Sequence, residues 1–477
     1  MHKEELKTVG IPNGQLLLKF QRVCNSILKQ GRISKAELLE ELKNMVADPL
    51  PFAKTKNQLR SLAKLLIEKA NVHTNEDEAI LYDIRAQAPE YPIYGKEHID
   101  AKALGQMDVA MRLPISVAGA LMPDAHAGYG LPIGGVLATD INTIIPYAVG
   151  VDIACRMCMS IFDVPPAILD KELPRLKSIL NENTFFGMGS TSKTHFDTGL
   201  FDSDAWNATK LIRSLKDKAY NQLGTSGTGN HFVEWGTLTV SGAGLPDLPA
   251  GEYLTLLSHS GSRGFGSTLA NYYSTLAIKK TGLPREAREL AWLDLNTAEG
   301  QEYWVSMNLA GDYASANHHE IHNKIAAKFG RQPLKRIENH HNFAWKEKLS
   351  DGREVMVHRK GATPAGKGVL GIIPGSMATP GFLVSGKGEV ASINSASHGA
   401  GRLMSRNQAF KEFKSEAVRE LLQSRGITLL GSGLDEAPMA YKDIHAVMEA
   451  QHNLVEVLGT FMPKIVKMAD PKERPED

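Results

Sequence analysis

The chain has few cysteines, no long apolar run and almost no net charge. Its 477 residues include three cysteines, Cys24, Cys155 and Cys158. This number is too small for a disulfide framework, so we expect a reducing, cytoplasmic compartment. No apolar run approaches the roughly 20 residues that span a bilayer, and the charged start, MHKEELKTVG, lacks a signal-peptide core. We therefore predict no membrane partner.

The charge balance gives no sign of a nucleic-acid partner. The chain carries 54 basic and 53 acidic side chains, a net charge of +1, whereas a nucleic-acid-binding protein usually has a visible basic excess. A local basic face can still exist within a neutral total. With 42% hydrophobic residues, the chain can bury a large core, and its length allows two or three domains.

The sequence changes in character near residue 92. Before it, apolar residues three and four positions apart recur in LLLKFQRVCNSILKQ, ISKAELLEELKNMV and NQLRSLAKLLIEKAN, which predicts a helical region over 1–91. After it, short apolar runs alternate with glycine-rich turns, as in YGLPIGGVLATD and TSGTGNHFVEWG. We predict one catalytic domain over 92–477, of mixed α/β (α+β) class, with helices at 205–222, 267–280 and 296–328.

Several of the sixteen histidines fall in glycine-rich loops. These are His126 in PDAHAGYG, His231 in GTGNHF, His259 in SHSGSRG, His340 and His341 in ENHHNF, and His398 in SASHGAGR. A single histidine of this kind is more often a structural residue than a ligand. Because the context recurs, and because glycine lets the backbone approach a ligand closely, we interpret the set as one site.

Asp152 and Cys155, in VGVDIACRMCM, add oxygen and sulfur to this set of nitrogen donors. Such a mixed ligand set binds transition metals, and one thiolate can bridge two ions of the kind used in phosphoryl chemistry. In a continuous strand, residues three apart face opposite sides. A shared metal site therefore requires a bend near Ile153 and Ala154.

Other interpretations of these cysteines and of two further motifs are weaker. Cys155 and Cys158 form a C-x-x-C, which could be a redox pair or half a zinc knuckle. However, the sequence continues as MCMSIFDV, typical of a strand, and a second C-x-x-C is absent. GATPAGKG lacks the hydroxyl residue of a phosphate-binding loop. His318 and His322 share a helical face without forming H-E-x-x-H, so a solvated or core helix is the favoured interpretation.

Nine motifs, in order from about residue 92 to 467, resemble the RtcB family of GTP-dependent RNA-splicing ligases. They are MPDAHAGYGLPIGG, AVGVDIACRM, GTGNHFVE, HSGSRG, HHN, RKGATPA, IIPGSM, SHGAGR and DEAPMAYKDI. The resemblance implies an RtcB-type core with two central Mn²⁺ ions. One would be bound by Asp152, Cys155 and His231, and the other by Cys155, His259 and His341. Ligand chemistry alone favours zinc; manganese comes from the resemblance. Cys158 has no implied role and is interpreted as a packed apolar residue.

The resemblance also implies a nucleotide site. His398 is similar to the histidine that becomes guanylylated, and Asp124 to an acidic residue near the metals. The implied GTP-binding residues are Asn230, His231, Phe232, Val233, Glu234, His341, Asn342, Pro374, Gly375, Ser376, Met377, Gly381, His398, Gly399, Ala400, Gly401 and Lys467.

The implied reaction joins an RNA 3′-phosphate or 2′,3′-cyclic phosphate end to a 5′-hydroxyl end. It would pass through guanylylated His398 and an RNA-3′-pp-5′-G intermediate, in tRNA splicing or RNA repair, and an activating protein factor is allowed for. The alternatives are a binuclear metal-dependent phosphohydrolase or nuclease, in which His398 is a general acid or base, and a binding protein without turnover.

The sequence departs from the commoner family pattern at three positions. Ala154 and Arg156 stand where glycines often flank the metal-binding cysteine, and Gly381 stands where many members have a serine near the guanine. An arginine beside the metals would contact phosphate or restrict access. These departures suggest a divergent branch, devoted to repair instead of intron removal.

Overall fold

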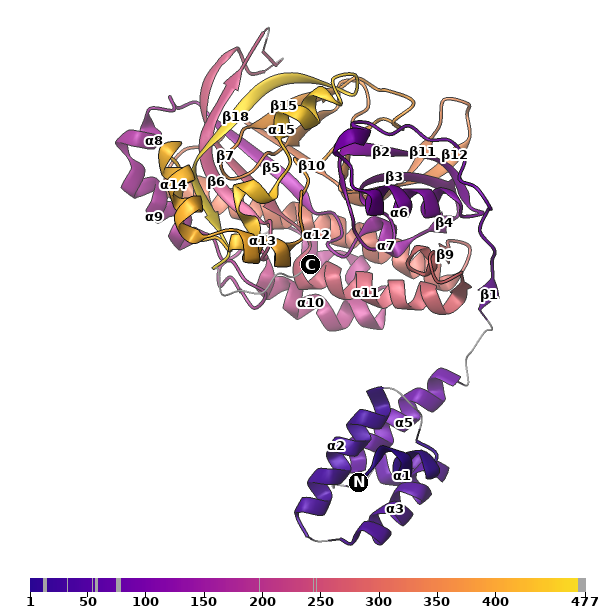
Figure 1. The fold of residues 1–477 in the computed structure, drawn as a ribbon. Helices are drawn as coiled ribbons and strands as arrows, with labels where there is room; N and C mark the ends of the chain where they lie inside the picture. The colour runs from indigo at the N-terminus through magenta and orange to yellow at the C-terminus, as the bar shows by residue number, and fades with distance from the viewer. Residues whose placement is uncertain are drawn as a thin grey trace. The chain divides into compact units, whose positions relative to one another are not determined.

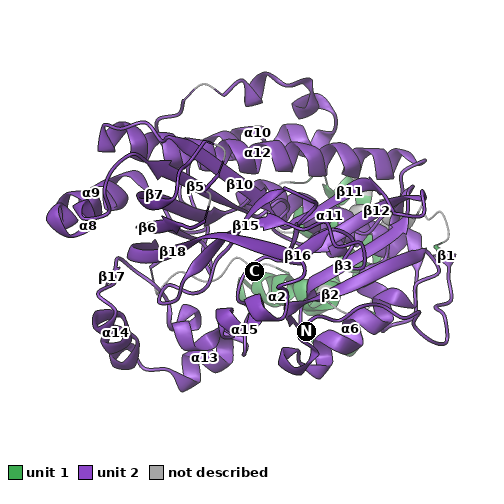
Figure 2. Ribbon diagram, turned by 90° about the horizontal axis from the view of Figure 1, so that it is seen from above, with its two compact units in different colours: residues 1–79 green, residues 80–477 purple. Residues whose placement is uncertain are grey.

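The chain folds into two compact units, Met1–Ala79 and Ile80–Asp477 (Figure 2). The computed structural model describes residues 1–477 except 12–14, 32, 54, 56–58, 74–78, 197, 243, 246 and 471–477. The boundary falls before the one expected after residue 91. The reason is that β1 (Ile80–Leu81) already pairs with β8 (Thr281–Gly282), and Tyr82 packs against the core of the second unit.

The first unit is helical, as the periodicity predicts. Its helices are α1 (Lys3–Thr8), α2 (Gln15–Lys29), α3 (Lys35–Ala47), α4 (Pro49–Ala53) and α5 (Leu59–His73). Ser34 and Glu37 form a capping box at the start of α3, each side chain accepting a hydrogen bond from the other's backbone N–H. Buried apolar side chains from α1, α2, α3 and α5 give this unit a core of its own.

The larger sheet of the second unit forms the wall from which most candidate ligands project. Its strand order is β10 (Lys335–His340), β5 (Arg156–Phe162), β7 (Gly251–Ser260), β6 (Phe232–Val240), β18 (Val455–Met468), β15 (Gly381–Gly386) and β14 (Leu370–Ile373). These neighbours are antiparallel, and β17 (Thr428–Leu429) adds a parallel pairing to β18. The sheet curls until its two edge strands meet. There the Asn339 side chain on β10 accepts from the N–H of Ile372 on β14 and donates to its C=O.

A smaller antiparallel sheet faces the site from the other side. Its order is β11 (Asn342–Lys348), β12 (Glu354–Lys360), β3 (Ile133–Asp140) and β2 (Ser116–His126). Short pairs join β4 (Thr143–Ile144) to β9 (Leu293–Asp294) and β13 (Ala362–Pro364) to β16 (Ser395–Ser397). Only His341 separates β10 from β11, so the chain passes there from one sheet directly to the other (Figure 1).

Helices cover the two sheets, and the longest spans both. They are α6 (Ala101–Met111), α7 (Pro146–Val149), α8 (Ile168–Lys171), α9 (Leu173–Asn183), α10 (Lys210–Gln222), α11 (Arg263–Lys280), α12 (Ala298–Phe329), α13 (Arg406–Glu412), α14 (Ser415–Ser424) and α15 (Ile444–Glu449). Thr297 caps the start of α12, and Gly330, at φ +78°, ends it. Ile321 of α12 packs in the core of the larger sheet, whereas Met307 packs with Phe343 of the smaller one.

The mixed α/β class is therefore confirmed. Helices α10, α11 and α12 lie along one side of both sheets (Figure 1), close to where helical segments were predicted. Within the described ranges, no helix combines the length and hydropathy needed to cross a bilayer.

Candidate active site

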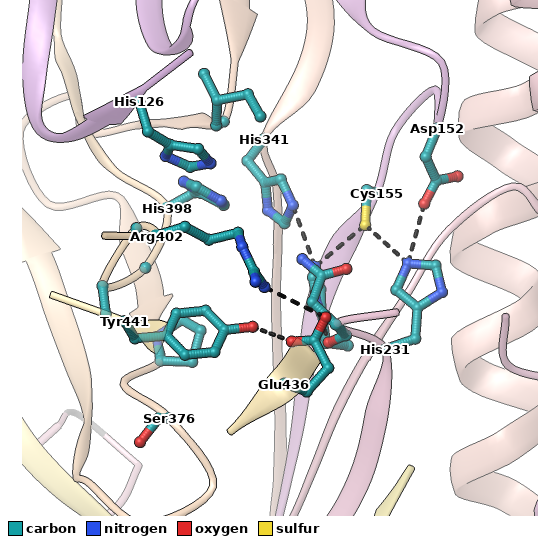
Figure 3. A pocket seen from close by; sticks show the side chains of 18 of the residues that line it. His126, Asp152, Cys155, His231, His341, Ser376, His398, Arg402, Glu436 and Tyr441 are labelled. Carbon is teal, nitrogen blue, oxygen red and sulfur yellow. Dashed lines mark hydrogen bonds and ion pairs between the residues drawn. The ribbon is translucent and has the colours of Figure 1, made fainter. Parts of the chain in front are cut away.

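A cavity of about 880 Å³ brings most of the predicted site residues together (Figure 3). Its lining includes five candidate metal ligands and the candidate nucleophile: Asp152, Cys155, His231, His259, His341 and His398. It also includes most of the predicted nucleotide contacts: Asn230, Phe232, Glu234, Asn342, Pro374, Gly375, Ser376, Met377, Gly381, Gly399, Ala400 and Gly401. These residues come from both sheets and from the loops between them.

A bend in the backbone brings Asp152 and Cys155 to the same side, as a shared site requires. Ala154 adopts a left-handed conformation with φ 57°, and β5 begins only at Arg156. The Cys155 N–H donates to the Asp152 carbonyl at 3.2 Å, and the Ala154 N–H donates to the Asn342 carbonyl at 2.7 Å. The predicted bend near Ile153 and Ala154 is thus confirmed.

Five donor atoms, one of which is the Cys155 sulfur, lie close together in the cavity. His231 Nε2 lies 3.1 Å from Asp152 Oδ2 and 3.4 Å from Cys155 Sγ. His259 Nε2 lies 3.1 Å from the same sulfur and 3.3 Å from His341 Nε2. Donors bonded to one ion at about 2.0–2.3 Å lie at comparable separations from each other. Cys155, His231 and His259 form a group whose donor atoms all lie within 4.8 Å of one another, and Asp152 and His341 extend this group through His231 and His259.

The protonation of these groups suits a cation. His259 Nδ1 lies 3.0 Å from the Asn230 carbonyl, which can only accept, so Nδ1 carries the hydrogen and Nε2 a lone pair. Burial, with neighbouring histidines, lowers the pKa of His259 to about 3 and that of His341 well below its usual range. Burial would raise the pKa of Asp152, but its hydrogen bond and attraction to His231 outweigh burial and bring it to about 2. The Asp152 carboxylate, the Cys155 sulfur and the neutral imidazoles of His259 and His341 are donors of the kinds that divalent transition metals take.

A close backbone approach fixes the Asp152 carboxylate. Ser262 donates to Asp152 Oδ1 from its backbone N–H at 3.0 Å and from its hydroxyl at 3.3 Å. A Cβ at Gly261 would overlap the carboxylate. Only glycine leaves room at this position, which accounts for the glycine in HSGSRG.

Asp124 does not line the cavity itself, but it holds the His398 side chain that does. His398 Nδ1 lies 2.7 Å from Asp124 Oδ2, which also accepts from the His398 backbone N–H at 3.1 Å. Burial alone would raise the pKa of Asp124, but His398 and the Lys442 ammonium hold it below its usual value. In the neutral ring, the carboxylate accepts from Nδ1–H and Nε2 carries the lone pair. Gly401, at φ +74°, permits this contact, because a Cβ there would overlap the Asp124 backbone.

Val233 and the Lys467 amino group are not brought to the cavity. These two residues pair across β6 and β18, as do Phe232 with Met468 and Glu234 with Val466. Because side chains alternate along a strand, Val233 and Lys467 face away from the cavity that Phe232, Glu234 and Met468 line. The Lys467 ammonium instead donates to carbonyls at the end of α9 and beyond, including Thr184 at 2.9 Å.

Arg156 does not contact the cavity, so the expectation that it binds phosphate or restricts access is wrong. It is 6% exposed and points toward α12. Its guanidinium pairs with Glu338 at 2.9 Å and donates to the Gly311 carbonyl at 3.3 Å. Arg156 is next to Cys155 in sequence, but it is the first residue of β5 after the bend. The alternation of side chains along the strand points it away from the cavity.

The polar lining residues that the sequence reasoning missed include Arg263, Lys360, Arg402, Arg406, Glu436 and Tyr441. All but Arg406 stand inside the quoted motifs HSGSRG, RKGATPA, SHGAGR and DEAPMAYKDI, which carried the signal without assigning roles. Tyr441 donates to Glu436, toward which Arg402 also points (Figure 3). Burial lowers the pKa of Lys360 to about 7.

A second Cys/His cluster lies between β5, which carries Cys158, and α12, which carries His318 and His322, and all three residues are fully buried. Its hydrogen bonds have one consistent direction. The Ser260 carbonyl accepts from His318 Nε2–H, and His318 Nδ1 accepts from the Ser258 hydroxyl. Ser258 in turn accepts from His322 Nε2–H, whose Nδ1 accepts from Ser160. These histidines are therefore core residues, one of the two options left open for this helix.

Comparison with known proteins places the chain in a family. The family model described as "tRNA-splicing ligase RtcB" matches residues 106–210 and 203–468. The RNA-splicing ligase RtcB of Escherichia coli is 36% identical over 371 residues, covering 72% of this chain and 88% of that protein. The tRNA-splicing ligase RtcB of Methanococcus maripaludis is 32% identical over 400 residues, 70% of this chain and 83% of that protein. That of Thermococcus kodakarensis is 30% identical over 417 residues, 72% and 86% respectively. The chain belongs to the RtcB family.

Proposed function

We propose that this protein is an RNA ligase that joins a 3′-phosphate or 2′,3′-cyclic phosphate end to a 5′-hydroxyl end. The family membership and the names of the relatives support an RNA ligase. The observation that carries the chemistry is the hydrogen bond between Asp124 and His398 Nδ1, which leaves Nε2 as the ring nitrogen that can attack. An imidazole so oriented is a competent nucleophile.

We infer two adjoining metal sites. Asp152, Cys155 and His231 would hold one ion, and Cys155, His259 and His341 the other. When bound, the ions would offset the charge that develops on phosphate groups during transfer. Manganese remains the expectation from the family resemblance.

Glu234 supports GTP as the nucleotide. This carboxyl lines the cavity, and burial raises its pKa well above the usual value. Burial thus disfavours the ionised form, and a ligand that donates two hydrogen bonds would restore it, because a carboxylate only accepts. The N1–H and amino group of guanine form such a donor edge, whereas adenine presents an acceptor at N1. Phe232, two positions earlier on β6, supplies an apolar wall.

The proposed reaction has three transfers. His398 Nε2 bonds to the α-phosphorus of GTP as the bond to pyrophosphate breaks. An oxygen of the RNA 3′-phosphate then takes the guanylate from His398, giving RNA-3′-pp-5′-G. Finally the 5′-hydroxyl attacks the RNA phosphorus, loses its proton and displaces GMP. A cyclic end is hydrolysed to the 3′-phosphate beforehand.

The hydrolase alternative is not favoured, because the relatives are named as ligases. Three points stay predictions: the choice between splicing and repair, the activating protein factor and the cytoplasmic location.

Exposure to α-labelled GTP with Mn²⁺ tests the proposal. We expect a covalent adduct that mass spectrometry maps to His398, and none in His398→Ala. The exposed His452, whose Nδ1 bonds a nearby carbonyl, provides a control, and His452→Ala should give the normal yield. An unchanged adduct in His398→Ala would refute the nucleophile, and failure of the wild type to join matched RNA ends would refute the ligase.

A further inference from the structure

Tyr129 is a large aromatic residue that the fold leaves open to solvent at the cavity. It is 63% exposed yet lines the same cavity as His398. It lies in the turn AGYGLP between β2 and β3. Burial of a tyrosine ring is normally favourable, so an exposed ring at the mouth of a site indicates a surface that meets a ligand.

The turn around Tyr129 is tied down at three successive residues. The Gln106 side chain accepts from the Gly128 N–H at 3.0 Å and donates to the Gly128 carbonyl at 2.6 Å. The Gly130 N–H donates to Glu289 at 2.8 Å. The buried Lys360 ammonium donates to the Tyr129 carbonyl. The backbone that carries the exposed ring is therefore fixed.

Lys360 links the Tyr129 turn to the segment that contacts the nucleophile, on a different sheet from the proposed guanine contacts. Lys360, which holds the Tyr129 carbonyl, is followed by Gly361, where a Cβ would lie 3.1 Å from His398 Cε1. Phe232 and Glu234 belong to the larger sheet, whereas Tyr129 follows a strand of the smaller sheet. The cavity thus offers a second aromatic surface beyond the one that GTP would use.

We propose that Tyr129 is a stacking platform for the unpaired nucleobase at an RNA end held for joining. This inference rests on the proposed RNA ligase function. Proteins recognise single-stranded RNA largely by stacking bases on aromatic side chains. Lys102, exposed on α6, and the half-buried Tyr147 line the same end of the cavity, and Lys102 supplies a cation for the flanking phosphate.

Steady-state joining by Tyr129→Ala, Tyr129→Phe and the wild type tests the platform. We expect Tyr129→Ala to raise KM for RNA roughly 10-fold, the loss typical of one base–aromatic stack, with kcat changed less. Tyr129→Phe keeps the ring and should stay within about 2-fold of the wild type. Tyr272→Ala is the control, because Tyr272 is 49% exposed on α11 and lies outside the cavity lining. Guanylylation without RNA reports whether Tyr129→Ala is correctly folded.

Substrates with one abasic nucleotide separate stacking from a structural effect. We place the abasic nucleotide at the 3′ terminus in one substrate and at the 5′ terminus in another. At one of these ends, the abasic nucleotide should raise the KM of the wild type about 10-fold. The KM of Tyr129→Ala should rise little further there, because the stack is already gone. The platform would be overturned if the effects of Tyr129→Ala and of the abasic nucleotide on KM were additive at both ends. It would also be overturned if KM were unchanged in Tyr129→Ala. Absence of joining by the wild type would instead defeat the proposed function.

Discussion

Two buried clusters near the start of β5 contain the same kinds of residue, one cysteine and at least two histidines, but their geometries differ. Around Cys155, the ring centroids of His259 and His341, which would bind the same ion, are 5.2 Å apart. Around Cys158, the centroids of His318 and His322 are 6.5 Å apart. Two imidazoles bonded to one zinc-like ion cannot have centroids more than about 6.4 Å apart, and in a tetrahedral site the value is about 5.2 Å.

Hydrogen bonding separates the clusters in the same way. Each of the four ring nitrogens in the Cys158 cluster has a serine or carbonyl partner. In the Cys155 cluster, Nε2 atoms face the sulfur and each other. Residue type therefore predicts a metal equally well at both places, and the direction of the lone pairs decides between them.

The largest effect that tests this contrast is expected from Cys155→Ser. Loss of a shared sulfur ligand should remove both ions and lower joining by more than about 100-fold, since even outer partners of metal ligands cost 10–100-fold. Metal content by mass spectrometry and joining rates are the measurements. Two tightly bound ions in this variant would contradict the shared role.

His322→Ala should act on stability and leave the metal site intact. It leaves the hydroxyls of Ser160 and Ser258 without this partner and opens a cavity, so the free energy of unfolding should fall by about 2–4 kcal/mol. Urea unfolding gives this value, and metal content should match that of the wild type. Loss of a bound ion without loss of stability would reverse the assignment of the two clusters.

A smaller effect concerns pH. Burial holds the pKa of His318 at about 3 in the folded chain against an ordinary 6.5, so the unfolded chain binds more protons between these values. This contribution to stability is complete above about pH 6.5 and is lost as the pH falls toward 3. In metal-free protein, His318→Gln should reduce the loss of unfolding free energy between pH 7 and pH 5 by about 2 kcal/mol. An unchanged pH slope would show that His318 does not stay neutral.

Cys158→Ser should have the smallest effect. Burial raises the pKa of the Cys158 thiol to about 12, so it stays protonated and is a poor metal ligand. We expect unchanged metal content and joining within about 2-fold of the wild type, as for a buried thiol that acts by packing. A fall in metal content matching that of Cys155→Ser would show that the clusters are not distinct.

The sequence allowed much of the site to be predicted because its motifs place chemical groups on short loops. The need for a bend at Ile153 and Ala154 follows from the period of a strand, and the structure has it. The side from which Asp124 meets His398 could not be predicted, because it depends on the approach of Gly401. Nor could the orientation of Lys467 be predicted, because it depends on how β18 pairs with β6, where the register shifts between Pro463 and Ile465. A proline within a strand marks an irregularity, but it does not give the register.

The left-handed backbone at Ala154 narrows the substitutions that position 154 can accept. Glycine adopts φ 57° without strain, asparagine and aspartate adopt it at small cost, and β-branched residues rarely do. A Cβ on Gly311 of α12 would lie 3.9 Å from the Ala154 methyl group, so a longer side chain at 154 would also press on that helix. In a saturation library selected for activity, we expect glycine and alanine to be enriched at this codon and valine and isoleucine to disappear.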